Sequence, residues 1–140
     1  MANKMILLVD DDPDVRLAMH VRLKANGYDT CFASDALSSI SEARKHQPDV
    51  IILDLGLPGG DGFMVIERLK RHPALAVIPI IVVSARDVGG NQDRAIKAGA
   101  KVYLQKPVDN FELLAIVRQT LGEPERPGDA DITGNWKLFA

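Results

Sequence analysis

Three consecutive aspartates, Asp10, Asp11 and Asp12, follow the apolar run at residues 5–9, and this part of the sequence most clearly indicates chemistry. Neighbouring carboxylates about 4 Å apart repel each other by roughly 4 kcal/mol at an effective dielectric constant near 20. Because this repulsion brings no structural benefit, a bound counter-charge is expected. A hard divalent cation such as Mg²⁺, which prefers oxygen ligands, is the natural candidate.

Three more apolar runs end in groups that complement these acids: residues 50–53 before Asp54, residues 80–83 before Ser84, and residues 102–104 shortly before Lys106. Asp10, Asp11 and Asp54 could bind Mg²⁺ together, and a carboxylate beside a metal ion can attack phosphorus. Phosphoryl transfer requires mainly position and positive charge around the phosphoryl oxygens. Mg²⁺ and Lys106 would supply that charge and Ser84 a hydroxyl, so the four strand ends predict a phosphoryl-acceptor site.

Each of these residues also has a structural explanation when it is taken alone. Acids at residues 10–14 suit the positive end of a helix dipole, and Asp12 and Asp14 fit that role. A serine after a strand is commonly a helix cap, and a lysine there is commonly solvated. The joint occurrence of these residues at the ends of successive apolar runs favours the functional interpretation for Asp10 and Asp11.

Short apolar runs alternate with helical spacing five times along the chain. Strands are expected at residues 4–9, 28–33, 50–54, from Pro79 onward, and 102–104. Helices are expected from Pro13 to Gly27, from a cap at Ser34 to His46, at 63–71, at 88–98, and from a cap at Asp109 to Leu121. Leu37, Ile40 and Ala43 are assigned to the inner face of the second helix, and Phe111 is among the apolar positions of the last.

Nearly continuous apolar strands, each followed by a helix, indicate a parallel sheet that is covered on both faces. Five such units in about 120 residues predict an α/β fold with a doubly wound five-stranded sheet. Ligands of such sheets bind beyond the carboxyl ends of the strands, where all four strand ends described above would lie. The second strand ends in Ala33 and Ser34, which offer little chemistry and suit a strand at the margin of the sheet.

The composition fits a globular protein with one core and argues against several functions. The chain has 140 residues, 46% hydrophobic and 26% charged, and its net charge of −2 does not suggest a nucleic-acid surface across the whole chain. No apolar stretch approaches the roughly 20 residues of a membrane span, and no secretion signal is recognised, so a cytoplasmic location is expected. The single cysteine, Cys31, cannot form an internal disulfide and is expected to pack in the core.

Four parts of the sequence resemble the receiver domain of the two-component response-regulator family: Leu-Leu-Val-Asp-Asp-Asp at 7–12, Leu-Asp-Leu at 53–55 with Leu-Pro at 57–58 and Asp-Gly at 61–62, Val-Ser-Ala at 83–85, and Tyr-Leu-Gln-Lys-Pro at 103–107. The resemblance implies a flavodoxin-like (βα)5 fold with strand order 2-1-3-4-5. Residues 1–121 would form the receiver domain. Residues 122–140 begin with a stretch rich in proline, glycine and acid, and we expect a linker or tail that could start a truncated effector domain.

The resemblance also implies a role for each site residue. Asp54 would be the phosphoacceptor, and Mg²⁺ would be bound directly by Asp11, chiefly through water by Asp10, and by the backbone carbonyl of Gly56. Lys106 would pair with the phosphoryl group, Ser84 would be the switch hydroxyl, and Tyr103 would be the ring that turns inward when Ser84 moves. The Lys106–Pro107 bond would be cis. The phosphoryl donor would be a sensor histidine kinase or a histidine phosphotransfer protein. The surface of the fourth helix, fifth strand and fifth helix would change shape and could form a homodimer. Such a domain is a signalling phosphoacceptor, and the only reactions it catalyses are its own phosphorylation and dephosphorylation.

A few residues depart from the family pattern or have a plainer explanation. Gly56 stands two residues after the acceptor, where a larger side chain is common, so an open acyl phosphate is expected, which Arg86 could partly cover. Gly59 and Gly60 make the following loop unusually free. Tyr103 could also be no more than a half-buried strand aromatic.

Three other functions fit parts of the sequence. A haloacid-dehalogenase-type phosphatase would use the Asp-x-Asp spacing at 10–12, but that family needs a threonine or valine where Asp14 stands. Flavin binding on the same fold needs a Ser/Thr-rich loop after the first strand, and the aspartates stand there instead. An unphosphorylated pseudo-receiver that only binds partners would not need the complete set of acid, hydroxyl and lysine.

The sequence says less about the output of such a domain. Arg94 and Arg118 could serve a dimer surface, but Lys101 and Val102 replace the acidic pair that precedes Tyr103 in the DNA-binding winged-helix subfamily. DNA binding would therefore depend on a missing effector domain, whose first strand could include Trp136.

Overall fold

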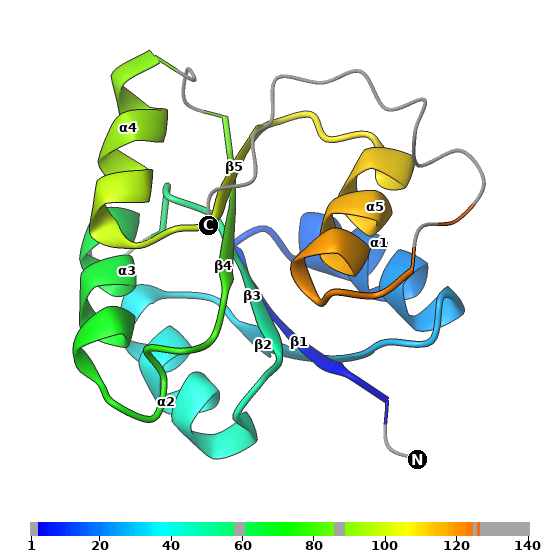
Figure 1. Ribbon diagram of the computed structural model, residues 1–140, viewed down its shortest axis with the longest axis horizontal. Coiled ribbons are helices and arrows are strands. Elements are labelled where there is room, and N and C mark those ends of the chain that lie inside the picture. The colour runs from blue at the N-terminus through cyan, green and yellow to red at the C-terminus, as the bar shows by residue number, and fades with distance from the viewer. Residues whose placement is uncertain (1–2, 58–60, 86–88, 125, 127–140) are drawn as a thin grey trace.

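The computed structural model describes residues 3–57, 61–85, 89–124 and 126, and in this part of the chain five strands alternate with five helices (Figure 1). In chain order the elements are β1 (Met5–Val9), α1 (Pro13–Ala25), β2 (Asp29–Ala33), α2 (Ala36–His46), β3 (Val50–Leu53), α3 (Gly62–Arg71), β4 (Ile80–Ser84), α4 (Gly89–Ala98), β5 (Val102–Gln105) and α5 (Asn110–Thr120). The expected order of strands and helices is confirmed.

The five strands are parallel and form one sheet in the order β2-β1-β3-β4-β5. Helices α2, α3 and α4 cover one face of the sheet, and α1 and α5 cover the other (Figure 1). The predicted α/β class, the doubly wound sheet and the strand order 2-1-3-4-5 are therefore confirmed. The second strand lies at the margin, and the strand order reverses between β1 and β3, where a ligand is expected.

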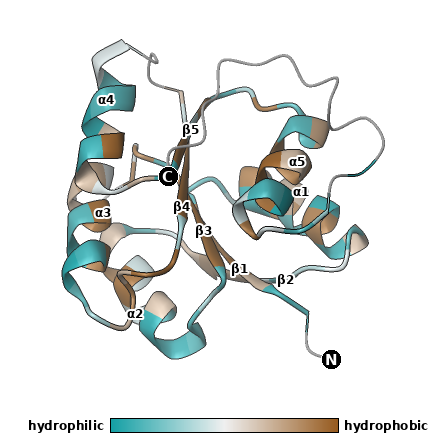
Figure 2. Ribbon diagram, viewed as in Figure 1, coloured by the Kyte–Doolittle hydropathy of each residue, from teal (hydrophilic) through white to brown (hydrophobic). Residues whose placement is uncertain are grey.

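Successive strand residues point to opposite faces, which gives the protein two hydrophobic clusters. On the side of α2, α3 and α4, Leu7 of β1 shares a cluster with Ile66 of α3. On the other side, Leu8 shares a cluster with Leu23 of α1 and Ile116 of α5. Figure 2 shows the apolar character of the strands between the helices. Because both faces are buried in apolar side chains, polar groups of the sheet gather at the strand ends.

The cap of α2 lies one residue later than expected. Asp35, not Ser34, is the N-cap: its side chain accepts a 2.7 Å hydrogen bond from the N–H of Ser38, and its own N–H donates to Ser38 Oγ at 3.3 Å. A carboxylate is a strong cap because it accepts this bond at the positive end of the helix dipole. The expected caps Asp12 and Asp109 are present in α1 and α5.

Two apolar side chains of the helices are exposed. Leu37 of α2 is 75% exposed, so its assignment to the inner face is wrong. The row of α2 that packs on the core begins at Ala36 and continues through Ile40 and Ala43, and Leu37 lies one position off that row. Phe111, in the first turn of α5, is 76% exposed and precedes the buried residues of that helix.

Other expectations have mixed outcomes. Cys31 is buried as expected, and burial raises the pKa of its thiol to about 11. Arg118 is only 7% exposed, so its assignment to a dimer surface is wrong. In the described part of the chain, no helix is both long and apolar enough to cross a membrane. Four residues that carried expectations lie outside the described ranges: Gly59, Gly60, Arg86 and Trp136.

Candidate functional site

Backbone pairing brings the four strand ends together at the carboxyl edge of the sheet. Val9 of β1 pairs with Leu53 of β3, and one step further the N–H of Asp54 donates to the carbonyl of Val9 at 2.9 Å. Past the end of β5, the N–H of Lys106 donates to the carbonyl of Ser84 at 2.7 Å. The backbone hydrogen bonds between neighbouring strands therefore continue past the strand ends and fix the positions of Asp54 and Lys106.

Asp10, Asp11 and Asp54 contribute carboxylate oxygens to one cluster. Their candidate ligand atoms all lie within 4.8 Å of one another. Asp10 is 4% exposed, Asp54 is partly buried and Asp11 is exposed, so the cluster is open to solvent on one side. Carboxylate oxygens at this spacing suit an octahedral divalent ion that keeps several waters, and the donor set fits Mg²⁺.

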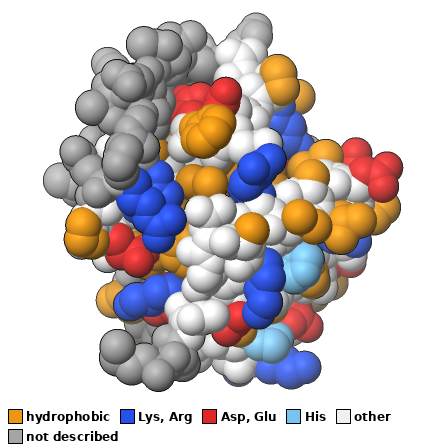
Figure 3. Space-filling view, turned by 90° about the vertical axis from the view of Figure 1, so that its right-hand side faces the viewer, with side chains coloured by type: hydrophobic (Ala, Val, Ile, Leu, Met, Phe, Trp, Pro, Cys, Tyr) orange, Lys and Arg blue, Asp and Glu red, His pale blue; other side chains and the backbone are white. Residues whose placement is uncertain are grey.

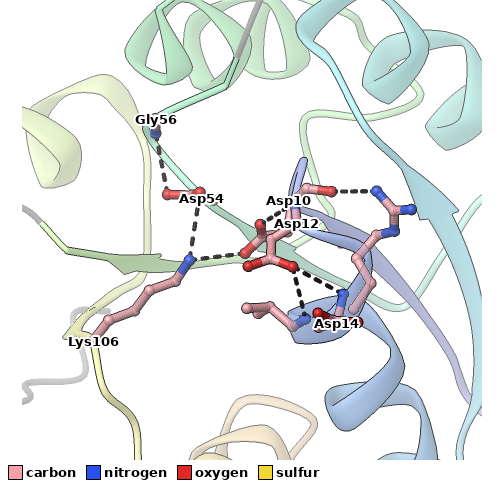
Figure 4. A network of polar contacts seen from close by, with 8 residues as sticks. Asp10, Asp12, Asp14, Asp54, Gly56 and Lys106 are labelled. Carbon is pink, nitrogen blue, oxygen red and sulfur yellow. Dashed lines mark hydrogen bonds and ion pairs between the residues drawn. The ribbon is translucent and has the colours of Figure 1, made fainter.

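Lys106, which directly follows β5, faces this cluster (Figure 4). Its Nζ donates a 2.9 Å hydrogen bond to Asp10 Oδ2 and lies 3.5 Å from Asp54 Oδ2. Burial on its own would lower the pKa of Lys106, but the hydrogen bond to Asp10 and the charge of Asp54 outweigh burial and raise that pKa. The amine is therefore protonated at neutral pH. It offsets one of three negative charges, and the remaining charge attracts a cation.

The carboxylate of Asp10 is held at both oxygens. Oδ1 accepts a 2.9 Å hydrogen bond from the N–H of Asp12, and Oδ2 accepts the bond from Lys106 (Figure 4). Asp12 itself belongs to the start of α1, where its side chain accepts from the N–H groups of Asp14 and Val15. Two adjacent acids thus have different tasks, since one faces the cluster and the other caps a helix.

Gly56 lies next to the Asp54 carboxylate. Its N–H donates to Asp54 Oδ1 at 3.1 Å (Figure 4). A Cβ at position 56 would lie 3.8 Å from Asp54 Oδ1 and 4.0 Å from Oδ2, so any side chain here would start against the carboxylate. With glycine in this place, that approach to Asp54 stays open.

The loop after β3 is anchored at its far end. Gly62 packs so closely against Leu55 that a Cβ would lie 2.5 Å from Leu55 Cα, and only glycine fits this contact. The N–H of Gly62 also donates to the Leu55 carbonyl at 3.2 Å. Asp61 then caps α3 by accepting a 3.0 Å hydrogen bond from the N–H of Phe63. These contacts hold the chain on both sides of the loop that contains Gly56.

Ser84 and Tyr103 lie on the neighbouring strands β4 and β5. Ser84 pairs with Gln105, two residues beyond Tyr103. Ser84 is buried at its strand end, and Tyr103 is fully buried in the cluster on the side of α2, α3 and α4. Tyr103 is thus a core residue and not a half-buried aromatic. The peptide bond between Lys106 and Pro107 is cis, as the resemblance implies.

Arg16 is a residue at this site that the sequence did not indicate. Its Nη1 donates a 2.7 Å hydrogen bond to the main-chain carbonyl oxygen of Asp10. The only signal available is a basic residue six positions after Asp10, and basic residues are common on helices. Because the acceptor is a carbonyl and not a carboxylate, no pairing of opposite charges in the sequence points to the contact.

Arg94, assigned to a dimer surface, joins α4 to the start of α3. Its guanidinium carbon lies 4.0 Å from the centroid of the Phe63 ring, and Nη2 lies 3.6 Å from Asp61 Oδ2. A cation over an aromatic ring at an exposed site contributes about 0.5–1 kcal/mol. Because Asp61 is the cap of α3, this contact couples α4 to the loop beside Asp54.

The profile of the response regulator receiver domain matches residues 6–118 of the chain. The chain belongs to this family. Receiver domains are phosphorylation-based signalling switches that bind Mg²⁺ in an acidic pocket and interact with histidine kinases or phosphotransfer proteins. The cluster of Asp10, Asp11 and Asp54 fits that pocket, and the resemblance seen in the sequence is confirmed.

Known proteins similar to the chain include a curated relative and two solved receiver domains. The DNA-binding dual master transcriptional regulator RpaA of Synechocystis sp. is 41% identical over 123 residues, which cover 86% of this chain and 50% of RpaA. The chain therefore spans half the length of this relative. The receiver domain of sensor histidine kinase PA1611 from Pseudomonas aeruginosa, with magnesium coordinated in its active-site cleft, has a TM-score of 0.80 at 28% identity and covers 87% of this chain and 100% of its own. The receiver domain of the Francisella response regulator 1452 also has a TM-score of 0.80 at 28% identity, with 86% and 98% covered.

Proposed function

We propose that this chain is a phosphorylation-dependent switch in which Asp54 accepts a phosphoryl group from a sensor histidine kinase or a histidine phosphotransfer protein. The observation that carries this proposal is the convergence of three carboxylates within 4.8 Å at a sheet edge where Lys106 supplies positive charge. Asp10, Asp11, Asp54 and the backbone carbonyl of Gly56 would hold Mg²⁺. When bound, Mg²⁺ would supply further positive charge to the phosphoryl oxygens.

Phosphoryl transfer requires the chain to supply a nucleophile and positive charge near the phosphoryl oxygens. A carboxylate oxygen of Asp54 forms the bond to phosphorus while the bond from phosphorus to the donor imidazole nitrogen breaks, and the nitrogen keeps the electron pair. Lys106, 3.5 Å from Asp54, would pair with the phosphoryl oxygens. Because Gly56 leaves the carboxylate open, water reaches the product, and we expect a comparatively short-lived acyl phosphate.

Ser84 and Tyr103 would pass the signal to the surface formed by α4, β5 and α5. A hydrogen bond from Ser84 to a phosphoryl oxygen is worth roughly 1.5–3 kcal/mol, which could shift a two-state equilibrium about 10–150-fold. Tyr103 already lies inside the core, so we assign the change to how firmly its ring is held there once Ser84 is engaged. The same surface could form a homodimer in the active state.

An apolar surface on α1 beside the site supports docking of a helical phosphodonor. Leu17 and Val21, one turn apart, are each 59% exposed. A neighbouring groove of about 380 Å³ reaches Lys106 and is lined by residues of α1, of the segment that leads into α5 and of α5 itself, including Val15, Met19, Val108 and Leu113. Figure 3 shows hydrophobic side chains among charged ones on this side of the molecule. Exposed apolar surface of this kind commonly marks a site of protein association.

Mass measurement of phosphorylation tests the acceptor. The chain is incubated with acetyl phosphate and Mg²⁺, and its intact mass is recorded. We expect the wild-type chain and the control Asp12→Asn, which alters only the helix cap, to gain one phosphoryl group, whereas Asp54→Asn gains none. An undiminished gain in Asp54→Asn would refute the assignment. Steady release of phosphate from a phosphate ester would instead favour the phosphatase alternative.

The docking surface has a separate test. Val21→Glu places a charge on the apolar part of α1 without touching the acidic cluster. We expect it to slow phosphoryl transfer from a phosphohistidine donor protein while leaving the rate with acetyl phosphate unchanged. Equal slowing with both donors would mean that the substitution disturbs the site and not the docking of a partner.

The output of the switch is proposed to lie in a further domain. The family match ends at residue 118, and the relative RpaA is twice as long as the matched region. Residues 122–140 would then connect the receiver domain to an output domain, and DNA binding would belong to that domain. A cytoplasmic location is proposed because phosphohistidine donors and Mg²⁺ are both present there.

A further inference from the structure

Arg16 reaches the acidic cluster through the main chain, because its guanidinium donates to a carbonyl there. It belongs to the first turns of α1, and its side chain is partly buried. The 2.7 Å hydrogen bond from its Nη1 ends on the main-chain carbonyl of Asp10, at the place where the chain leaves β1. The arginine therefore reaches back six residues and acts on the main chain beside the cluster.

The carbonyl of Asp10 belongs to the peptide unit that also contains the N–H of Asp11. Because a peptide unit is planar, fixing the direction of its carbonyl fixes the plane that joins the two residues. The side chain of Asp10 is already held by Asp12 and Lys106. Asp11 is exposed, and the direction of its side chain depends on that peptide plane. The contact made by Arg16 therefore restrains the backbone from which the carboxylate of Asp11 extends.

We propose that Arg16 is a positioning residue for the cation site, acting through the Asp10–Asp11 peptide. This inference rests on the proposed function of the acidic cluster as a Mg²⁺ site. Arg16, a residue of α1, would orient the carboxylates of Asp10 and Asp11 through the peptide that joins them and not through their side chains. Groups that orient metal ligands in this way typically change metal affinity 10–100-fold when they are removed.

The charge of Arg16 and its hydrogen bond predict opposite changes in Mg²⁺ affinity when they are removed. A guanidinium near the cluster opposes the approach of a second cation, so removal of its charge alone would tighten Mg²⁺ binding. Loss of the hydrogen bond to Asp10 frees the peptide to rotate and would weaken Mg²⁺ binding instead. The direction of the change in affinity therefore separates positioning from simple electrostatics.

Calorimetric titration of the whole chain with Mg²⁺ alone tests the inference. Arg16→Met keeps the aliphatic stem of the side chain and removes donor and charge, and we expect Mg²⁺ affinity to fall about tenfold. Arg16→Lys keeps one donor and the charge, so it should recover part of the loss. Arg22→Met, an exposed arginine on the same helix, is the matched control and should bind as the wild type does.

Hydrogen exchange without Mg²⁺ provides a second measurement. The amides of Asp11 and Asp12 should exchange faster in Arg16→Met than in Arg22→Met, while amides in the middle of β1 stay protected. Unchanged or tighter Mg²⁺ binding in Arg16→Met would overturn the proposal. If Arg16→Met does not fold, Arg16→Ala, which removes the donor and the charge together with the whole side chain, replaces it, and unchanged or tighter Mg²⁺ binding there would also overturn the proposal. Failure of the wild-type chain to bind Mg²⁺ would instead refute the proposed function.

Discussion

Acidic side chains have different surroundings at the two ends of the sheet. At the amino end, three acids each have a donor of their own: Asp49 has the N–H of Met5 at 2.8 Å, Glu123 has the hydroxyl of Tyr28 at 2.6 Å, and Asp29 has the ammonium of Lys24 at 2.7 Å. At the carboxyl end, Asp10 and Asp54 share Lys106, and Asp11 lies beside them within the same cluster. The amino end thus distributes its acids among separate partners, whereas the carboxyl end brings three carboxylates around one cation and keeps excess negative charge there.

This difference separates acids that support the fold through single contacts from acids whose mutual repulsion favours a bound cation. An acid that has a donor and no crowding acidic neighbour gains little from a further cation, and its removal only costs a contact. Acids crowded around a single cation repel one another, so the folded chain is destabilised there until another cation arrives. The number of acids at a strand end is thus a weaker sign of function than the crowding of several acids around a single cation.

The largest effect is expected from Lys106→Met, which removes the ammonium that the acids share. Breaking one partner of a buried ion pair costs 3–5 kcal/mol, and because the Lys106 side chain is 24% exposed we expect a smaller loss, about 2 kcal/mol, in the free energy of unfolding without Mg²⁺. Saturating Mg²⁺ should restore much of this loss, since the ion replaces the missing charge. Urea denaturation with and without Mg²⁺ measures both, with Lys45→Met on α2 as control. An equal loss under both conditions would contradict the excess of negative charge at this end.

Tyr28→Phe is the counterpart at the amino end. Its hydroxyl donates a 2.6 Å hydrogen bond to Glu123, which ties the segment after α5 to the start of β2. A bond to a charged acceptor contributes roughly 1.5–3 kcal/mol, and we expect a loss near 1.5 kcal/mol because part of this segment is exposed. The loss should be the same with and without Mg²⁺. A loss that depended on Mg²⁺ would break the comparison, because the two ends would then be coupled.

The stability that Tyr28 provides should also depend on pH. Burial, then the hydrogen bond and the charge of Glu123, raise the pKa of Tyr28 in the folded chain. The unfolded chain therefore loses the phenolic proton first, near pH 10. The contribution of the phenol is fully present below that pH and declines as pH rises above it. The stability difference between the wild type and Tyr28→Phe should accordingly shrink above about pH 10, as denaturation at a series of pH values can show.

Asp11→Asn and Asp49→Ala should change stability in opposite directions. Without Mg²⁺, Asp11→Asn removes a charge that repels its neighbours and should raise the free energy of unfolding by about 1 kcal/mol. Asp49→Ala removes the acceptor of the Met5 N–H and should lower it by about 1 kcal/mol. Saturating Mg²⁺ should cancel or reverse the gain in Asp11→Asn, because a ligand is lost. Matched denaturation curves measure the two variants, and the same sign in both would mean that the two ends do not differ.

The sequence predicted the carboxyl end well because its residues follow buried strands directly. In a parallel sheet the carboxyl ends of all strands meet at one edge, so the types of Asp10, Asp54, Ser84 and Lys106 and their positions after apolar runs were enough. No knowledge of side-chain conformation was needed. The backbone ladder, which continues to Asp54 and Lys106, does the positioning.

Features that depend on one helical position or on a side-chain path were not predictable in this way. Ser34 and Asp35 are both good caps, so propensity could not separate them. Helix α2 has few apolar residues, and its inner row was misplaced by one position at Leu37. The contacts of Arg16 with a carbonyl and of Tyr28 across 95 residues depend on where side chains reach after folding. Local periodicity contains no information about either.

The smallest effect is expected from Asp29→Asn, which completes the comparison. Asp29 forms an ion pair with Lys24 at 2.7 Å, and its hydrogen bond to Lys24 lowers its pKa. Both side chains are well exposed, however, and solvent screens such pairs so strongly that many contribute nothing measurable. Because the folded pKa is lowered, any contribution is present above the unfolded pKa near 4 and is lost as pH falls below it. We therefore expect the denaturation curves of Asp29→Asn and wild type to superimpose at neutral pH, with and without Mg²⁺. A loss as large as that of Tyr28→Phe would show that an exposed, solvent-screened pair at the amino end stabilises the fold strongly, and the low value assigned to such isolated pairs would then be wrong.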